Sequence, residues 1–138
     1  MSPPTRLDAV VRFREVDEDR ARHNMAEAQR LALATEAAVR IAAARAMADE
    51  RRRGSSDDWS LVENAHIRAL QDARRAEHEK VMAEEKLGLS RERFLSARKR
   101  AEAMRRVREF RLSELRVAER QGELKEMDAL ATLLYGRR

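Results

Sequence analysis

The sequence predicts an all-α protein: an antiparallel coiled-coil hairpin of two long helices, with the second helix projecting beyond the first. Two observations lead to this fold class. Charged residues make up 40% of the 138 residues and aromatic residues only 4%, yet 43% of the residues are hydrophobic. The hydrophobic residues are mostly Ala and Leu that recur at helical spacing, which is typical of long helices and coiled coils rather than of a disordered chain.

Proline and glycine mark where the helices begin and end. Proline occurs only at Pro3 and Pro4, so no later segment carries the residue that costs about 3 kcal/mol inside a helix. Gly54 follows a run of Arg residues, and both features favour the C-terminal end of a helix. The next helix can be capped by Ser55, Ser56 or Asp57, or alternatively by a capping box of Ser60 and Glu63.

These signals predict a single helical-hairpin domain over residues 1–138. The first helix is expected over about 5–52, the turn over about 53–56 and the second helix over about 57–135.

Each predicted helix carries a seam, meaning a row of residues at alternating steps of four and three that faces the other helix. In the first helix the seam consists of Ala21, Met25, Ala28, Ala32, Thr35, Val39, Ala42 and Ala46. In the second helix it consists of Val62, His66, Ala69, Ala73, Ala76, Lys80, Ala83, Leu87, Ser90, Phe94, Ala97, Ala101 and Met104. Two such helices joined by a short loop predict an antiparallel pair. Because Ala dominates both seams, we expect a close approach with little area buried per layer.

The lengths of the two helices predict an overhang. Pairing back from a turn at Gly54 places Leu7 opposite residues around 101–104. The second helix then continues for about thirty residues, or about 45 Å. Its apolar positions shift after the seam ends, to Val107, Phe110 and Leu115 and then to Val117, Leu124, Met127, Ala131 and Leu134. An apolar row that outlasts its intramolecular partner predicts a binding surface for another protein.

Groups that carry out catalysis or hold a metal are not predicted. The chain has no Cys, and its three histidines, His23, His66 and His78, are too far apart for a helical metal pair. The glycines are isolated, so no phosphate-binding loop exists, and Gly88 and Gly122 interrupt the second helix. We therefore expect no enzyme activity, no catalytic residues, no metal and no cofactor.

Hydropathy predicts a cytoplasmic protein without a transmembrane segment. No stretch approaches the roughly 20 apolar residues needed to span a bilayer, and the first residues do not read as a signal peptide.

Positive charge is concentrated in one segment of the second helix. Arg91 to Arg120 contains eleven Lys or Arg against five Asp or Glu, although the whole chain has a net charge of only +5. Its densest part, Arg98 to Arg111, has three interpretations: a solvated helix face, a nucleic-acid contact, or a collar that binds an acidic protein surface. Periodicity does not separate the last two interpretations.

Two segments resemble the FliJ family of flagellar type III export proteins. Arg6 to Arg30 is similar to the family's opening helix, in which early apolar residues precede a charged, Ala-rich stretch. Arg105 to Ala131 resembles its closing helix, where an Arg-rich run leads to an ER-x-x-EL-x-E-x-D pattern. That pattern is matched here by Glu119, Arg120, Glu123, Leu124, Glu126 and Asp128. The middle of the chain, Arg40 to Glu85, carries no matching motif.

The resemblance implies a non-enzymatic stalk of the flagellar type III protein export apparatus. Such a stalk inserts its paired ends into a hexameric export ATPase, promotes ring assembly and activity, contacts the cytoplasmic domain of the export gate membrane protein, and binds export chaperones. It would act in the cytoplasm, peripherally at the inner membrane, in flagellum biogenesis and motility. The residues implied for the ATPase ring are Leu7, Val10, Arg14, Arg105, Arg108, Arg111, Leu115, Glu119, Arg120, Glu123, Leu124 and Met127. Those implied for the export gate are Ala69, Leu70, Ala73 and Ala76.

Three alternatives remain open on the sequence. The chain could be the equivalent stalk of a virulence injectisome. It could instead be a basic coiled-coil protein that binds nucleic acid, although we expect no nucleic-acid partner. It could also be a structural coiled coil that self-associates.

Overall fold

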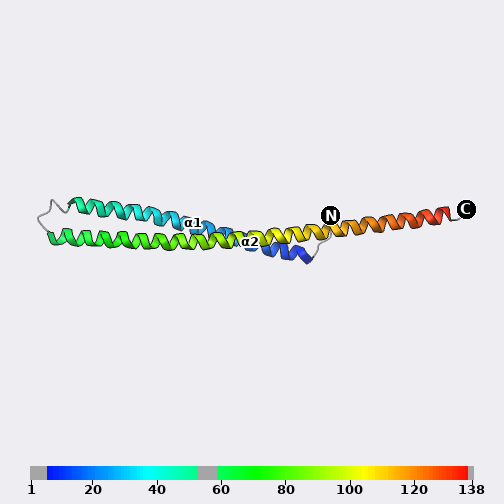
Figure 1. Ribbon diagram of the computed structural model, residues 1–138, viewed down its shortest axis with the longest axis horizontal. Helices are drawn as coiled ribbons and strands as arrows, with labels where there is room; N and C mark the ends of the chain where they lie inside the picture. Colours follow the sequence, from blue (N-terminus) through cyan, green and yellow to red (C-terminus); the bar gives the residue numbers. More distant parts are fainter. Residues whose placement is uncertain (1–5, 53–58, 137–138) are drawn as a thin grey trace. The chain divides into compact units, whose positions relative to one another are not determined.

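The computed structural model describes residues 6–52 and 59–136, which form two helices followed by one turn residue, Gly136. Helix α1 spans Arg6–Arg52 and helix α2 spans Trp59–Tyr135 (Figure 1). The predicted all-α hairpin of two long helices is confirmed, and this part of the chain contains no strand. The predicted turn over 53–56, with Gly54 and the caps Ser55, Ser56 and Asp57, lies outside the described residues, as do Pro3 and Pro4.

The long helix α2 runs through both of its internal glycines. Neither Gly88 nor Gly122 has a positive φ, and a Cβ added to either would meet nothing within 4 Å. Neither position therefore serves a turn or a close approach of the kind that requires glycine. At the end of α2, the backbone N–H of Gly136 donates to the carbonyl of Thr132 at 2.8 Å.

Sections of α1 and α2 pair in two compact units. Unit 1 consists of Met1–Glu18 and Ala97–Arg138, and unit 2 consists of Asp19–Ser96.

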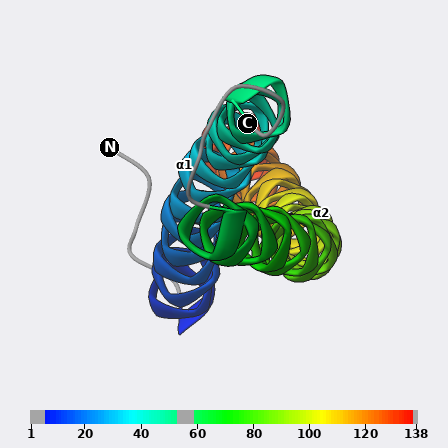
Figure 2. The same cartoon turned by 90° about the vertical axis from the view of Figure 1, so that its left-hand side faces the viewer.

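In unit 2 the two helices lie side by side, as Figure 2 shows from the end where α1 stops and α2 begins. Every residue predicted for the α1 seam, from Ala21 to Ala46, is buried or half-buried. The same is true of α2 from Val62 to Phe94, including the two polar positions His66 and Lys80. The heptad spacing therefore predicted the packed faces of this unit correctly.

The packed faces are made of small side chains. Among the described residues the buried hydrophobic residues are Val11, Ala28, Ala69, Ala76, Ala83, Ala97 and Ala101, and no large side chain is fully buried. Alanines allow the helices to approach closely but remove little apolar surface from water per layer. Stability therefore comes from many small contributions along the pair.

In unit 1 the heptad spacing of α1 continues through residues that the sequence analysis did not assign to the seam. Leu7, Val11, Arg14 and Glu18 follow steps of four, three and four, and all four are buried or half-buried. Opposite them, α2 presents the predicted Ala97, Ala101 and Met104, which are buried or half-buried. It also presents Leu115 of the predicted apolar row and three residues outside that row: Arg105, Arg108 and Leu112.

The predicted register of this pairing was wrong. Leu7 was expected opposite residues around 101–104, but the neighbouring Asp8 forms an ion pair with Arg108. The overhang is accordingly shorter: all residues from Arg116 to Tyr135 are exposed, which corresponds to about 30 Å of helix.

After Met104 the predicted apolar row leaves the face that packs on α1. Val107 and Phe110, the first two residues of that row, are 48% and 66% exposed. The positions that face α1 after Met104 are instead occupied by Arg105, Arg108 and Leu112. Arginine can occupy a seam here because α1 supplies carboxylates opposite it.

Candidate functional site

Ion pairs hold α1 to α2 in unit 1. The carboxylate of Glu18 accepts a hydrogen bond from Nη2 of Arg105 at 3.1 Å, and Glu15 accepts one from Nε of Arg105 at 3.2 Å. Glu18 is only 6% exposed, so its charge is buried against the arginine. Burial of a charge is tolerated when it is paired and hydrogen-bonded, as it is here.

The hydrogen bond to Glu15, together with the interaction with Glu18, raises the pKa of Arg105 above its ordinary value. A raised pKa means that the stabilisation is fully present below the ordinary value and is lost only as the pH rises through the raised one. The guanidinium of Arg105 therefore keeps its charge at every pH near neutrality.

The second ion pair of unit 1 joins Arg108 to Asp8. Arg14 lies in the same α1 face but differs from these residues. Its Nε is buried without a hydrogen-bond partner among the described residues, and its guanidinium lies 5.7 Å from the ring centroid of Phe13. The seam of unit 1 is thus a mixed charged and apolar layer rather than a plain alanine seam.

The basic stretch Arg98 to Arg111 is largely neutralised by carboxylates. Besides the pairs of Arg105 and Arg108 with α1, Arg98 pairs with Glu102 at 3.2 Å and Arg111 with Glu114 at 3.2 Å. Four of its cations therefore already have carboxylate partners. The cations for which the described residues show no ion pair are Lys99, Arg100 and Arg106.

The end of α2 carries a second row of apolar side chains, which we name the free stripe. Its residues follow steps of three and four from Phe110 to Leu134 and are Phe110, Ser113, Val117, Arg120, Leu124, Met127, Ala131 and Leu134. All of them are exposed; Val117 is 52%, Leu124 60% and Met127 65% exposed. This is the heptad spacing of a helix-pairing face, yet nothing in unit 1 covers it.

The residues implied for the ATPase ring fall into two groups. Leu7, Arg14, Arg105, Arg108 and Leu115 lie in the α1–α2 seam of unit 1, and Val10 beside them is 39% exposed. The second group is exposed on α2 and consists of Arg111, Glu119, Arg120, Glu123, Leu124 and Met127. Only the second group presents an open surface.

The residues implied for the export gate do not form one surface. Ala69 and Ala76 are both 8% exposed and Ala73 is half-buried, because all three face α1 in unit 2. Leu70 points away from the seam and is 42% exposed, with Ile67 exposed three residues before it. A contact in this region would use Leu70 and its exposed neighbours.

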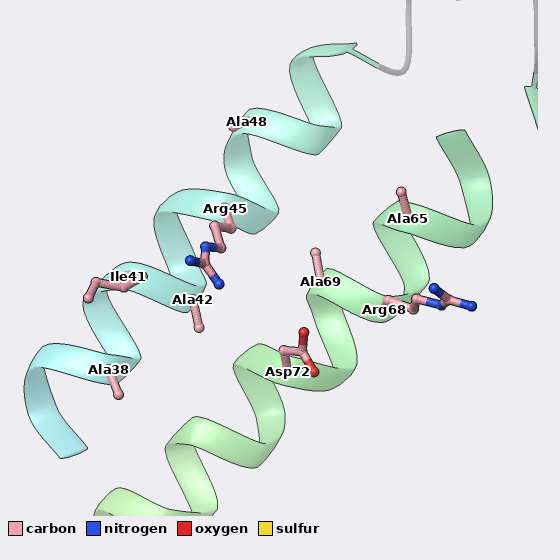
Figure 3. A pocket seen from close by; sticks show the side chains of 9 residues that line it. All are labelled: Ala38, Ile41, Ala42, Arg45, Ala48, Ala65, Arg68, Ala69 and Asp72. Carbon is pink, nitrogen blue, oxygen red and sulfur yellow. The ribbon is translucent and has the colours of Figure 1, made fainter. Parts of the chain in front are cut away.

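Two grooves run along unit 2. One, of about 580 Å³, is lined largely by alanines of both helices, and Figure 3 shows Ala42 of α1 and Ala69 of α2 pointing into the space between them. The charged residues along it, Arg45, Arg68 and Asp72, include no nucleophile beside a base. The other groove, of about 530 Å³, is lined by residues that include Leu31, Met82 and Leu89. Neither groove brings together a catalytic set.

The described residues contain no group of three or more acidic or histidine side chains that could hold a metal ion. Over the same residues, neither helix has a window apolar enough to cross a bilayer.

Sequence reasoning missed Asp8, Glu15 and Glu18, which anchor the arginines of α2. For Glu18 the sequence did contain a signal. Together with Leu7, Val11 and Arg14 it continues the predicted α1 heptad in phase.

Comparison with known proteins gave no relative: no protein-family model, no curated protein and no solved structure matches the chain.

Proposed function

We propose that this chain is a stalk-like, non-enzymatic component of the flagellar type III protein export apparatus, whose free end inserts into the hexameric export ATPase. The observation that carries the proposal is the free stripe, an exposed heptad row on α2 that begins at Phe110 and continues well past Leu115, the last residue that faces α1. A single helix with a long exposed apolar row is suited to enter a hole lined by partner subunits. The resemblance of Arg6 to Arg30 and Arg105 to Ala131 to the FliJ family supports the choice of that partner.

In this proposal unit 1 contributes two features. The α1–α2 seam, with Arg105 bound to Glu15 and Glu18, fixes where the paired part ends. The exposed segment beyond Leu115 makes the contact with the ring. The stalk promotes assembly and activity of the ATPase by binding several subunits at once, not by chemistry of its own.

The proposal also includes a link to the export gate membrane protein and to export chaperones, with the protein working in the cytoplasm at the inner-membrane base of the apparatus. For the gate contact we favour the exposed face of Leu70 and Ile67, because Ala69, Ala73 and Ala76 are covered by α1. The equivalent stalk of an injectisome would use the same surfaces.

Nucleic-acid binding is less well supported. A phosphate-binding patch needs uncompensated cations, and most of the cations between Arg98 and Arg111 are paired with carboxylates.

The test is stimulation of a purified, hexamer-forming export ATPase by the full chain and by a chain that ends at Leu115. This end point is chosen because a cut before Arg105 would also remove the ion-pair partners of Glu18 and Asp8. We expect the full chain to stimulate the ATPase and the shortened chain to fail, while circular dichroism shows that it keeps its helical hairpin. Equal stimulation by both chains would rule out the free end as the ring contact.

A further inference from the structure

The free stripe and the α1–α2 seam lie on different faces of α2. In a helix each residue advances about 100° around the axis. On that count the free stripe lies nearly half a turn from the row formed by Ala101, Arg108 and Leu115. A partner can therefore lie on the free stripe without displacing α1 from unit 1.

The length of the free stripe is that of a specific helix-pairing surface. From Phe110 to Leu134 it covers about three and a half heptads, enough to sustain a two-helix coiled coil. Two of its positions are polar, Ser113 and Arg120. A polar residue at such a position selects partners and fixes register, because it must be satisfied by the residue opposite.

Half of the residues on either side of the free stripe are acidic, and only one is basic. In a coiled coil the positions that flank the apolar row contact the partner's flanking positions and set partner choice. Here these positions are all exposed and consist of Glu109, Glu114, Arg116, Gln121, Glu123, Asp128, Leu130 and Tyr135. Glu114 is already paired with Arg111, but Glu109, Glu123 and Asp128 have no ion pair among the described residues.

This charge pattern disfavours a second copy of the chain as the partner. A parallel pair would bring Glu123 beside Asp128 of the other copy and place two Arg120 side chains in one layer. A fully overlapped antiparallel pair would bring Glu123 against Glu123 and Glu114 against Asp128. Like charges are opposed in both orientations, and such contacts are destabilising.

We infer that the free stripe binds an amphipathic helix of another protein, with Lys or Arg at its flanking positions and an acidic residue in the layer opposite Arg120. The basic flanks meet Glu109, Glu123 and Asp128, and the acidic residue satisfies the one charged position of the stripe. This inference deepens the proposed function, since it states the chemistry of the element that the free end contacts.

The test uses designed peptides and the full chain. The first peptide has about four heptads with Leu at the apolar positions, Lys at the flanks and one Glu placed opposite Arg120. A second peptide differs only in having Glu at the flanks, and a third has the composition of the first in scrambled order. Binding is measured by fluorescence anisotropy at physiological salt, where pure charge attraction is weakened.

We expect the peptide with Lys flanks to bind at least about tenfold more tightly than either of the others. The variant Glu123→Lys/Asp128→Lys should reverse the preference, so that the peptide with Glu flanks binds better. Leu124→Asp/Met127→Asp should abolish binding, whereas Leu133→Asp, an exposed apolar residue outside the stripe, should leave it unchanged.

Three results would overturn the inference. Equal binding of the scrambled peptide would mean that only charge is recognised. Equal binding of the peptides with Lys and Glu flanks would show that the acidic flanking residues do not select the partner. A stable dimer in sedimentation experiments that Leu124→Asp/Met127→Asp dissociates would assign the stripe to a second copy.

The peptide test involves no ATPase, so it can fail separately from the proposed function. If the chain selects the peptide with Lys flanks but does not stimulate the ATPase, the inference about the free stripe stands and the proposed stalk function is rejected. If stimulation depends on the free end but the peptides bind equally, the stalk function stands and the inference about the partner helix is rejected.

Discussion

Arg105 of α2 donates a hydrogen bond to the carboxylate of Glu18 of α1, and this carboxylate is almost fully buried. The pair joins residues that are far apart in sequence, and a second hydrogen bond from Arg105 reaches Glu15. It therefore ties the first section of α1 to one place on α2. Beyond that place α2 soon becomes exposed and carries the free stripe.

The first prediction concerns this pair. Arg105→Ala removes the guanidinium that donates to the buried carboxylate of Glu18, so we expect the melting temperature to fall by several degrees. Glu18→Leu with Arg105→Leu removes both charges and fills the space with apolar groups, so it should recover most of the loss. Thermal unfolding followed by circular dichroism measures both, with Arg106→Ala on the exposed face as the control. If the losses from Arg105→Ala and Glu18→Ala simply add in the double variant, the two residues are not coupled.

The second prediction concerns the closeness of the helices. Ala101 is 0% exposed in the seam of unit 1, so Ala101→Leu has no room and should destabilise the hairpin by about 1–3 kcal/mol. Ala103→Leu is the matched control, because Ala103 is exposed two residues away on the same helix. Denaturant unfolding gives both free energies. A stabilised Ala101→Leu variant would show that the seam is loosely packed.

The third prediction concerns the two glycines inside α2. Since a Cβ at Gly88 or Gly122 meets nothing within 4 Å, alanine should fit at both positions and stabilise the helix by up to about 1 kcal/mol each. For Gly88→Ala the gain should raise the melting temperature, because unit 2 pairs there. For Gly122→Ala it should slow amide hydrogen exchange in the exposed segment around residue 122. Destabilisation at either position would indicate that flexibility or a close approach is needed there.

The predictability of this fold follows from its repetition. Every residue that the heptad spacing assigned to the seam of unit 2 is buried or half-buried, including the unfavourable His66 and Lys80. A short period repeated over many turns leaves few alternatives. The exact register was missed because it also depends on which side chains pair across the two helices, such as Asp8 with Arg108, and not on the position of the turn alone.

The charged layers of unit 1 were missed for a different reason. A sequence reading assigns Arg and Glu to solvent, since either one alone is costly to bury. Arg105 and Glu18 become suitable seam residues only as a pair, and pairing across two helices is not visible in the local pattern of either.

The central claim is that the free stripe is the surface through which the chain binds the export ATPase. Its most direct test is a binding titration of the purified ATPase with the full chain, with Leu124→Asp/Met127→Asp and with Leu133→Asp. Burial of an apolar side chain of this size contributes about 1.5–3 kcal/mol, so the double variant should bind more than about tenfold more weakly. Leu133→Asp, which lies off the stripe, should bind like the unaltered chain. Unchanged binding of Leu124→Asp/Met127→Asp would contradict the claim.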